Sequence, residues 1–382
     1  MYPLFHVVFW VTFFLCLSTY CLYPMTILII SKLRPFRPNR QDIDPSVSII
    51  ITAFNEEKHI ETKIQNTLSL DYPKNKLEII VGSDGSTDGT NEIAGRYQDQ
   101  GIRLLAFPVN RGKTAVQNDC VNAANGDILI FMDAASFLQK DALKKLVRNF
   151  ADPHVGCVAG RLEFVNLREN LTTASQGFYW KYEVRIRELE SSLGSLIGLD
   201  GPLYAIRKED YVPLAANMIS DFLSPLLILA NGKKVVLEPE APVLEDPTSS
   251  SMSEFRTRRR IALRAFVALA AHPRLLNVFK NPALAPQIIF HKLIRWLVGP
   301  LVVLNFFACL FLWSYPPFLV MLCLYLLFFM LAGLGFFVNR FGKGSGILMV
   351  PYYFTLVNAA ASLGLLDFLR KKQAISWQPS RV

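Results

Sequence analysis

The sequence predicts an α/β domain with a mostly parallel sheet, flanked by apolar segments that are long enough to cross a membrane. Of the 382 residues, 52% are hydrophobic and 19% are charged, whereas roughly 25% are charged in an average soluble domain. The excess of apolar residues lies at the two ends of the chain. The middle has an ordinary composition and alternates short β-branched runs with helix-like segments, which is typical of βαβ units.

The first apolar segment covers residues 4–30, which include no Lys, Arg, Asp or Glu. A helix of that length measures roughly 40 Å, enough to span a bilayer with some tilt. A cleaved signal peptide is the alternative. However, no basic region precedes the run and no small-residue cleavage site follows it, so we predict a retained membrane anchor.

The C-terminal part has two further uncharged runs, 296–338 and 347–366. The first is too long for one span, and Ser314–Pro317 supplies a turn signal near its middle, so it predicts a hairpin of two helices. The placement of basic residues predicts an N-terminus outside and a central segment in the cytoplasm. The basic residues that indicate this are Lys32, Arg34, Arg37, Arg40, Arg340 and Lys343.

The last uncharged run is ambiguous. Arg370, Lys371 and Lys372 follow it, and they disagree with the charge rule if residues 347–366 cross the membrane completely. Either this run lies in the interface or re-enters, or the charge rule fails here. In each case the chain is expected to be a multi-pass protein of the cell (inner) membrane.

In the middle of the chain, four short apolar runs read as strands: 47–53, 77–81, 102–107 and 127–132. Polar clusters follow three of them, at 55–57, 83–86 and 133. Ligands of parallel sheets bind where strands end, so these clusters are expected to form a site.

Several classes of site are excluded. Gly112-Lys113-Thr114 is not a phosphate-binding P-loop, because that motif needs a glycine at position 107, which is Phe. The glycines at 82, 85 and 89 do not form a dinucleotide-binding GxGxxG motif. The six cysteines include no C-x-x-C pair, which argues against zinc. The net charge of +9 suits anionic headgroups and substrates. No basic-aromatic RNA motif is present, so no nucleic-acid partner is expected.

Six motifs then occur in a fixed order: VSIIITAFNEE, VGSDGSTDGT, NRGKTAVQN, IFMDAAS, ISDF and SEFRTRRRI. Each is weak by itself. In this order and between terminal membrane spans, they resemble the membrane-integrated family 2 glycosyltransferases with a GT-A fold. This is the group of hyaluronan, chitin and cellulose synthases and of bacterial exopolysaccharide glycosyltransferases.

The resemblance implies a Rossmann-like GT-A domain in the cytoplasm and a division of the chain into four parts. These are an N-terminal anchor with its basic flank (1–40), the GT-A domain (41–252), basic and amphipathic interface helices (253–289), and a C-terminal transmembrane region with a short tail (290–382). It also implies an inverting hexosyl- or N-acetylhexosaminyltransferase that uses a UDP-sugar. The acceptor is then a growing polysaccharide or a membrane-associated molecule.

The nucleotide sugar is expected to contact residues that follow the first three strands. By resemblance Asp84 is the nucleotide-binding aspartate, and Asn55 and Glu57 lie near the same pocket. Asp84 otherwise caps the next helix. Lys113 follows the third strand, where a cation can meet the diphosphate. Its alternative role is a solvated helix start.

Asp133 ends the fourth strand and resembles the first aspartate of the family's DxD motif, which holds Mg²⁺ or Mn²⁺ against the diphosphate. This sequence departs from the DxD motif, because Ala135 occupies the position where the second aspartate is expected. Hard divalent cations take oxygen ligands and keep substrate phosphates and waters. The phosphates are therefore expected to supply most of the metal's ligands.

Asp221 falls where the family has its catalytic acid pair, with Ser220 replacing the usual first acid. Inverting transfer needs a base for the acceptor hydroxyl, and one carboxylate suffices. Asp221 otherwise caps the next helix. Arg260 matches the arginine of the Q/R-x-x-R-W motif, where a cation stabilises the departing UDP. The alternative is a basic helix on anionic lipid.

The acceptor is expected near Gly201, in a glycine-rich loop, and near Trp180, whose ring can stack on sugars or belong to the core. Four spans make a small pore, so a second copy of the chain or an export partner is a further candidate partner beside membrane lipids. Two rivals remain open. One is a polyprenyl-phosphate glycosyltransferase that makes a single lipid-linked sugar, and the other is a non-catalytic family member that acts in assembly.

Overall fold

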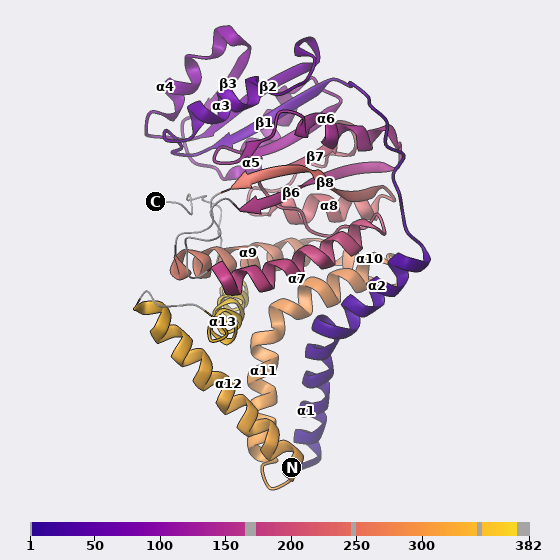
Figure 1. Ribbon diagram of the computed structural model, residues 1–382, viewed down its shortest axis with the longest axis vertical. Coiled ribbons are helices and arrows are strands. Elements are labelled where there is room, and N and C mark those ends of the chain that lie inside the picture. The colour runs from indigo at the N-terminus through magenta and orange to yellow at the C-terminus, as the bar shows by residue number, and fades with distance from the viewer. Residues whose placement is uncertain (1, 165–172, 246–249, 342–345, 373–382) are drawn as a thin grey trace.

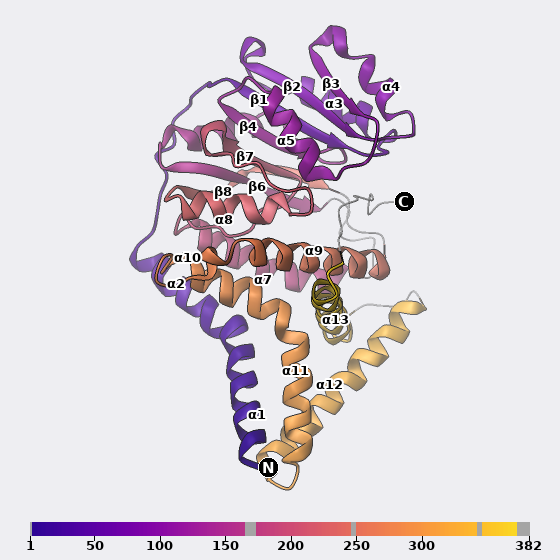
Figure 2. The ribbon, with the colours of Figure 1, turned by 180° about the vertical axis from the view of Figure 1, so that it is seen from behind.

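The computed structural model describes residues 2–164, 173–245, 250–341 and 346–372. An α/β domain lies at one end of the molecule, and three long helices project from the opposite side (Figures 1 and 2). Between them lies a layer of helices that includes α7 (Thr173–Ser191) and α9 (Ser251–Ala271). The predicted class, an α/β domain flanked by apolar helices, is confirmed.

Among the described residues, eight strands form one sheet in the order β3-β2-β1-β4-β7-β6-β8-β5. The first four strands in this order are parallel, and β7 is antiparallel to both β4 and β6. The strands are β1 (Val47–Ala53), β2 (Leu77–Asp84), β3 (Ile102–Phe107), β4 (Ile128–Asp133), β5 (Phe137–Leu138), β6 (Val155–Phe164), β7 (Leu203–Arg207) and β8 (Lys234–Glu245).

Both faces of the parallel part of the sheet are covered, which explains why its strands are continuous apolar runs. Every residue of β1 is buried. Ile49 and Ile51 face one core together with α3 (Ile60–Leu68), and Ile50 faces the other core together with α5 (Lys113–Ala123). The remaining helices of the domain are α4 (Thr90–Gly95), α6 (Ala142–Val147) and α8 (Ser220–Ala230).

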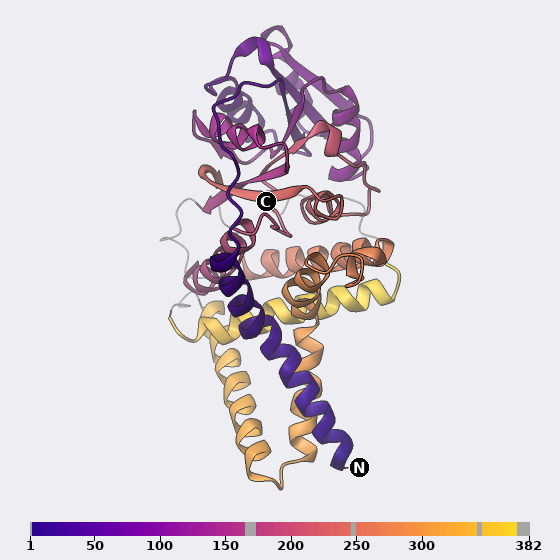
Figure 3. The ribbon, with the colours of Figure 1, turned by 90° about the vertical axis from the view of Figure 1, so that its right-hand side faces the viewer.

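Three apolar helical segments project from the domain and converge at the end farthest from it (Figures 1 and 3). The first is a continuous segment, Tyr2–Leu33, made of α1 (Tyr2–Leu17), a π-helical turn and α2 (Tyr23–Leu33). The predicted hairpin consists of α11 (Ile294–Phe311) and α12 (Pro316–Arg340), and the turn falls at the predicted Ser-Tyr-Pro-Pro sequence. By length and composition these helices can cross a membrane.

The helix α13 (Met349–Leu369) has the length and composition of a span, yet it lies across the direction of α11 and α12. Figure 1 shows it end-on, and Figure 3 shows it lengthwise beside α9. Arg259 of α9 makes a two-pronged ion pair with Asp367 of α13, with N···O distances of 2.5 and 2.9 Å. This arrangement is the one expected if the last uncharged run lies in the interface, and the position of α13 in the membrane stays a prediction.

Candidate functional site

A cavity of about 430 Å³ lies between the carboxyl edge of the sheet and the helices α7, α9 and α11. The residues that line it come from β4, α5, α8 and α9 and from the loop before β7, so distant parts of the chain meet there. Six of the residues predicted for the site line this cavity: Lys113, Asp133, Trp180, Gly201, Asp221 and Arg260.

Lys113, Asp133 and Asp221 form the polar centre of the cavity. The Lys113 ammonium, at the first residue of α5, makes an ion pair with the Asp133 carboxylate at the end of β4. A Cβ added to Gly201 would lie 2.7 Å from Asp221 Oδ2 and 3.7 Å from Lys113 Nζ. The loop therefore passes Asp221 closely only because residue 201 has no side chain.

Asp221 is suited to accept a proton. Burial raises the pKa of its carboxyl group, and the nearby Asp133 raises it further, while Lys113 and Arg264 act in the opposite direction. A carboxylate with a raised pKa is a stronger base than a solvated one. The backbone carbonyl of Asp221 also accepts a hydrogen bond from the Leu199 N–H at 3.0 Å, which ties α8 to the glycine-rich loop.

Two arginines of α9 face the same centre. Arg260 lines the cavity, and burial lowers the pKa of its guanidinium although Asp221 and Asp133 oppose the shift. Arg264 lies one helical turn later, and burial lowers its pKa to about 10. Arg264 therefore stays charged at neutral pH. Arg259 points instead to Asp367 of α13, so α9 divides its arginines between the cavity and the neighbouring helix.

Asp84 does not line the cavity. Its two carboxylate oxygens accept the backbone N–H groups of Arg111 and Gly112 at 2.7 and 2.9 Å, and its side chain is buried. These bonds hold the turn that leads into α5. Asp84 thus places Lys113 at the cavity, and its contact with a nucleotide stays a prediction.

Asn55 and Glu57 also lie outside the cavity lining and join two loops. Asn55 adopts a left-handed backbone conformation with φ of 52°, and its Oδ1 accepts the Thr87 N–H at 2.9 Å. Glu57 Oε2 accepts the Gly89 N–H at 3.0 Å. These bonds fix the loop after β1 against the loop after β2, and the predicted nucleotide contacts of both residues remain predictions.

The region of Asp133 fits a divalent cation only if the substrate supplies most of the ligands. The Asp133 side chain is 24% exposed in the cavity, which leaves it accessible. Ala135 also lines the cavity, and Ser136 is fully buried, with its hydroxyl donating to the Asp133 carbonyl at 2.8 Å. The described residues contain no group of three or more His, Cys, Asp or Glu arranged for a metal. One carboxylate completed by phosphates and waters is a common Mg²⁺ site.

The sequence analysis missed a buried lysine beneath Asp133. Lys63 of α3 is fully buried, and its ammonium donates to the Ser136 carbonyl at 2.6 Å. Burial lowers its pKa to about 7. The helical spacing does indicate that Lys63 is buried, because Lys63 falls on the same face of α3 as the buried residues Ile60 and Thr67.

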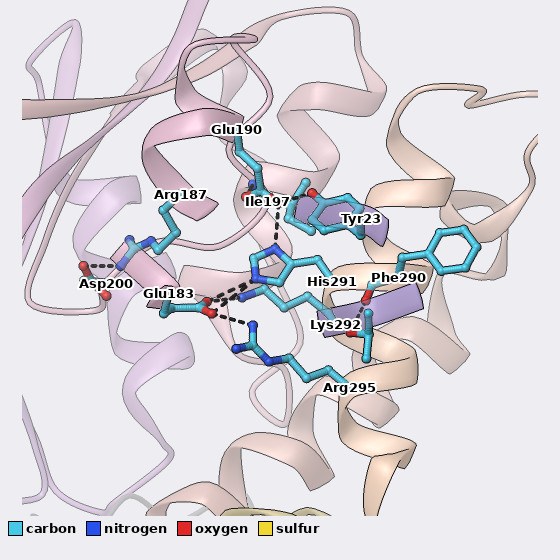
Figure 4. Close-up of polar contacts among 11 residues, drawn as sticks. Tyr23, Glu183, Arg187, Glu190, Ile197, Asp200, Phe290, His291, Lys292 and Arg295 are labelled. Atoms are coloured by element: carbon cyan, nitrogen blue, oxygen red, sulfur yellow. Dashed lines mark hydrogen bonds and ion pairs between the residues drawn. The ribbon is translucent and has the colours of Figure 1, made fainter. Parts of the chain in front are cut away.

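A second missed group lies at the membrane side of the cavity (Figure 4). Glu183 of α7 meets Lys292 Nζ at 3.0 Å and Arg295 Nη1 at 2.6 Å, and His291 Nε2 lies 3.3 Å from it. Although burial raises the pKa of Glu183, the cations of Lys292 and Arg295 hold that pKa well below its usual range. No local sequence motif predicts this group, because over a hundred residues separate Glu183 from its partners.

The same group is anchored to the first membrane segment. Glu190, about two helical turns beyond Glu183, lies 2.6 Å from His291 Nδ1 and accepts a hydrogen bond from the hydroxyl of Tyr23. Beside it, Arg187 makes an ion pair with Asp200 at 2.5 Å. Among the described residues, the Arg187 Nε and Nη2 atoms have no hydrogen-bond partner. We call Glu183, Arg187, His291, Lys292 and Arg295 the membrane-side cluster.

The chain is similar in sequence to known glycosyltransferases. Residues 48–212 match the family described as Glycosyl transferase family 2. An N-acetylglucosaminyltransferase of Azorhizobium caulinodans is 27% identical over 46% of this chain and 45% of its own. The probable glycosyltransferase YdaM of Bacillus subtilis is 31% identical over 38% and 39%. A beta-monoglucosyldiacylglycerol synthase of a Nostoc species is 26% identical over 48% and 40%. The matched segments thus span less than half of each relative.

A solved structure agrees over almost the entire chain. A mannosyltransferase from Pyrobaculum calidifontis, in complex with GDP-Man and Mn²⁺, matches 96% of this chain and 100% of its own with a TM-score of 0.73 and 21% identity. At this identity the match establishes the fold, which is a Rossmann-like GT-A fold with attached apolar helices. The similarity to glycosyltransferase family 2 thus covers residues 48–212, which is less than half of the chain.

Proposed function

We propose that this protein transfers a sugar from a nucleoside diphosphate sugar to a membrane-associated acceptor, with inversion at the anomeric carbon. The observation that carries the proposal is the meeting of Lys113, Asp133, Asp221 and Arg260 around one cavity. A carboxylate base and several cations are what this reaction requires, because a hydroxyl loses a proton while a diphosphate gains charge.

The donor diphosphate would lie near Lys113 and Arg260. Lys113 stands at the first residue of α5, where backbone N–H groups and the helix dipole also favour an anion. Asp133 would hold a Mg²⁺ or Mn²⁺ ion, whose chemistry is to neutralise the charge that grows on the leaving diphosphate. Arg260 and Arg264 add fixed positive charge that needs no reorganisation during the reaction.

Asp221 would take the proton of the acceptor hydroxyl. The acceptor oxygen then bonds to C1 of the donor sugar as the bond between C1 and the diphosphate oxygen breaks, and the nucleoside diphosphate leaves with that electron pair. The buried position of Asp221 raises its pKa and makes it a better base. Trp180 and Gly201 line the same cavity and would border the acceptor sugar.

The acceptor is proposed to reach the cavity from the membrane, because α9 and α11 form its lower wall. The membrane-side arrangement favours a lipid-linked acceptor over a free soluble sugar. Repeated transfer to a growing polysaccharide and transfer of a single sugar to a polyprenyl phosphate differ in the size of the product. Of the relatives, the beta-monoglucosyldiacylglycerol synthase carries a lipid in its name, which supports a membrane-bound acceptor here.

A donor screen with the purified full chain tests the proposal. The chain would be placed in lipid membranes and supplied with UDP-linked and GDP-linked hexoses and N-acetylhexosamines together with Mg²⁺ or Mn²⁺. The release of the nucleotide would be measured. We expect release with one class of donor and loss of release on chelation of the metal. A protein that binds UDP or GDP with Mn²⁺ but releases nothing from any donor would be a non-catalytic family member.

A further inference from the structure

An apolar hollow of about 200 Å³ adjoins the cavity on its membrane side. The hollow and the cavity share Arg258, Ile261, Arg295 and Trp296 as lining residues. Its other walls come from α13, α7 and the first membrane segment, and they are mainly aromatic and aliphatic. These residues are Tyr20, Tyr182, Val350, Tyr353, Phe354, Val357, Asn358 and Ala361.

Cations lie where the hollow meets the cavity. Arg258 and Arg295 line both spaces. Lys292 and Arg295 both make ion pairs with the carboxylate of Glu183 (Figure 4). A planar guanidinium beside an ammonium is a common recognition pattern for phosphate.

The wall of the cavity also contains a buried guanidinium group, that of Arg187, with N–H donors that are not used. Arg187 lines the cavity and is 5% exposed. One of its nitrogens binds Asp200, while its Nε and Nη2 lack a hydrogen-bond partner among the described residues. Buried donors are rarely left unsatisfied unless a ligand or water completes them. An anion that enters this end of the cavity supplies the acceptor atoms that these donors lack.

We propose that the acceptor is a lipid phosphate that carries the acceptor sugar, bound across the junction of the cavity and the apolar hollow. The hydrocarbon next to the phosphate occupies the hollow, and the phosphate meets Arg258, Arg295 and the membrane-side cluster. The sugar then extends past Trp180 toward Asp221, and its hydroxyl is the group that reacts as described above. The inference rests on the proposed function and names the substrate class of its acceptor site.

The position of the hollow agrees with this occupant. It is bordered by α13, which lies across the spanning helices beside α9 (Figure 3), at the level where the domain meets the projecting helices. Aromatic side chains such as Tyr353 and Trp296 are common at the depth of lipid headgroups. A lipid there keeps most of its chain in the bilayer, since the hollow has room only for the carbons nearest the headgroup.

Binding to three probes separates lipid from free phosphate. The full chain in nanodiscs would be titrated with phytanyl phosphate, phytanol and inorganic phosphate, with tryptophan fluorescence as the signal because Trp296 lines both spaces. We expect phytanyl phosphate to bind roughly tenfold more tightly than either fragment. Equal binding of phytanol, or equal binding of inorganic phosphate, overturns the inference.

Two variants with matched controls locate the site. Arg258→Gln should weaken phytanyl phosphate binding roughly tenfold, whereas Arg256→Gln, an exposed arginine of the same helix, should not. Val357→Trp fills the hollow and should also weaken binding, whereas Leu363→Trp, an exposed position of α13, should not. Unchanged binding in both site variants refutes the inference. Nucleotide release from a donor in membranes tests the proposed function separately: release by the wild type together with unchanged phytanyl phosphate binding in both site variants overturns this inference and leaves the proposed function standing.

Discussion

At the residue scale, the cavity depends on carboxylates whose environments differ. Asp133 makes an ion pair with Lys113 and is partly exposed. Asp221 is buried, and burial raises the pKa of its carboxyl group. Asp84 is saturated by backbone donors and acts through the turn that it holds. Three acids that look alike in the sequence therefore have three different tasks, which only their surroundings distinguish.

Asp221→Asn should lower nucleotide-sugar turnover by roughly a hundredfold or more, which is the usual contribution of a general base. The substitution keeps the shape of the side chain but removes its basicity. In the wild type, kcat/KM should fall as the pH is lowered through the pKa of Asp221, which lies above its usual value. Steady-state rates between pH 4 and 8 measure both effects, and turnover that is unchanged in the variant excludes Asp221 as the base.

Lys63 makes stability depend on pH. Its pKa is lowered to about 7 in the folded protein, while the unfolded chain keeps an ordinary value of about 10.4. Between these values the unfolded state binds the extra proton, so the free energy of unfolding should rise with pH. Lys63→Met should remove this rise, which thermal unfolding at pH 7 and pH 9 measures. Lys58→Met, an exposed control on the preceding loop, should keep it, and an unaltered slope in Lys63→Met contradicts the assignment.

At the element scale, the parallel half of the sheet was predicted well. The runs 47–53 and 102–107 coincide with β1 and β3, because strands buried on both faces are continuous apolar sequences. The strands β5, β6, β7 and β8 were not predicted. They add an antiparallel part to the sheet, and their pairing partners lie far away in the sequence, so no local pattern indicates them.

The contact of α13 with α9 depends on a small residue. A Cβ at Gly364 would lie 2.7 Å from the Arg259 carbonyl oxygen and 2.8 Å from the Ala262 side chain. Gly364→Leu should therefore push the helices apart and cost about 1–3 kcal/mol, as overpacking does. Gly333→Leu in α12 is the control, because nothing lies within 4 Å of a Cβ there. Thermal unfolding in detergent compares the two, and equal midpoints contradict the close packing of α13 on α9.

At the scale of the whole molecule, the crosswise position of α13 removes the conflict in the charge pattern. If α13 lies in the interface, Arg370–Lys372 stay on the same side as Arg340 and the α/β domain, as the charge rule requires. Three segments then cross the membrane: the first, which ends at Leu33, and the two helices of the hairpin. The cytoplasmic orientation and the location in the inner membrane remain predictions.

Cysteine labelling tests this topology. In a variant without the six native cysteines, a membrane-impermeant maleimide applied to intact cells should label Ser314→Cys, in the turn between α11 and α12. It should not label Lys280→Cys or Lys372→Cys until the cells are opened. Labelling of Lys372→Cys in intact cells would show that α13 crosses the membrane and that our placement is wrong.

The sequence alone determined the long apolar helices, the parallel strands and six residues that line the cavity, because hydrophobic periodicity and short motifs are local properties of the chain. The tertiary structure decided what depends on contacts between distant segments. It showed that the side chains of Asp84, Asn55 and Glu57 hold loops in place. It also showed that α13 lies across the direction of α11 and α12. It also assembled the membrane-side cluster from α7, the π-helical turn Ile288–Leu293 and the start of α11. Ion pairs and close packing act between side chains that fold together, and their partners leave no mark in the linear order of residues.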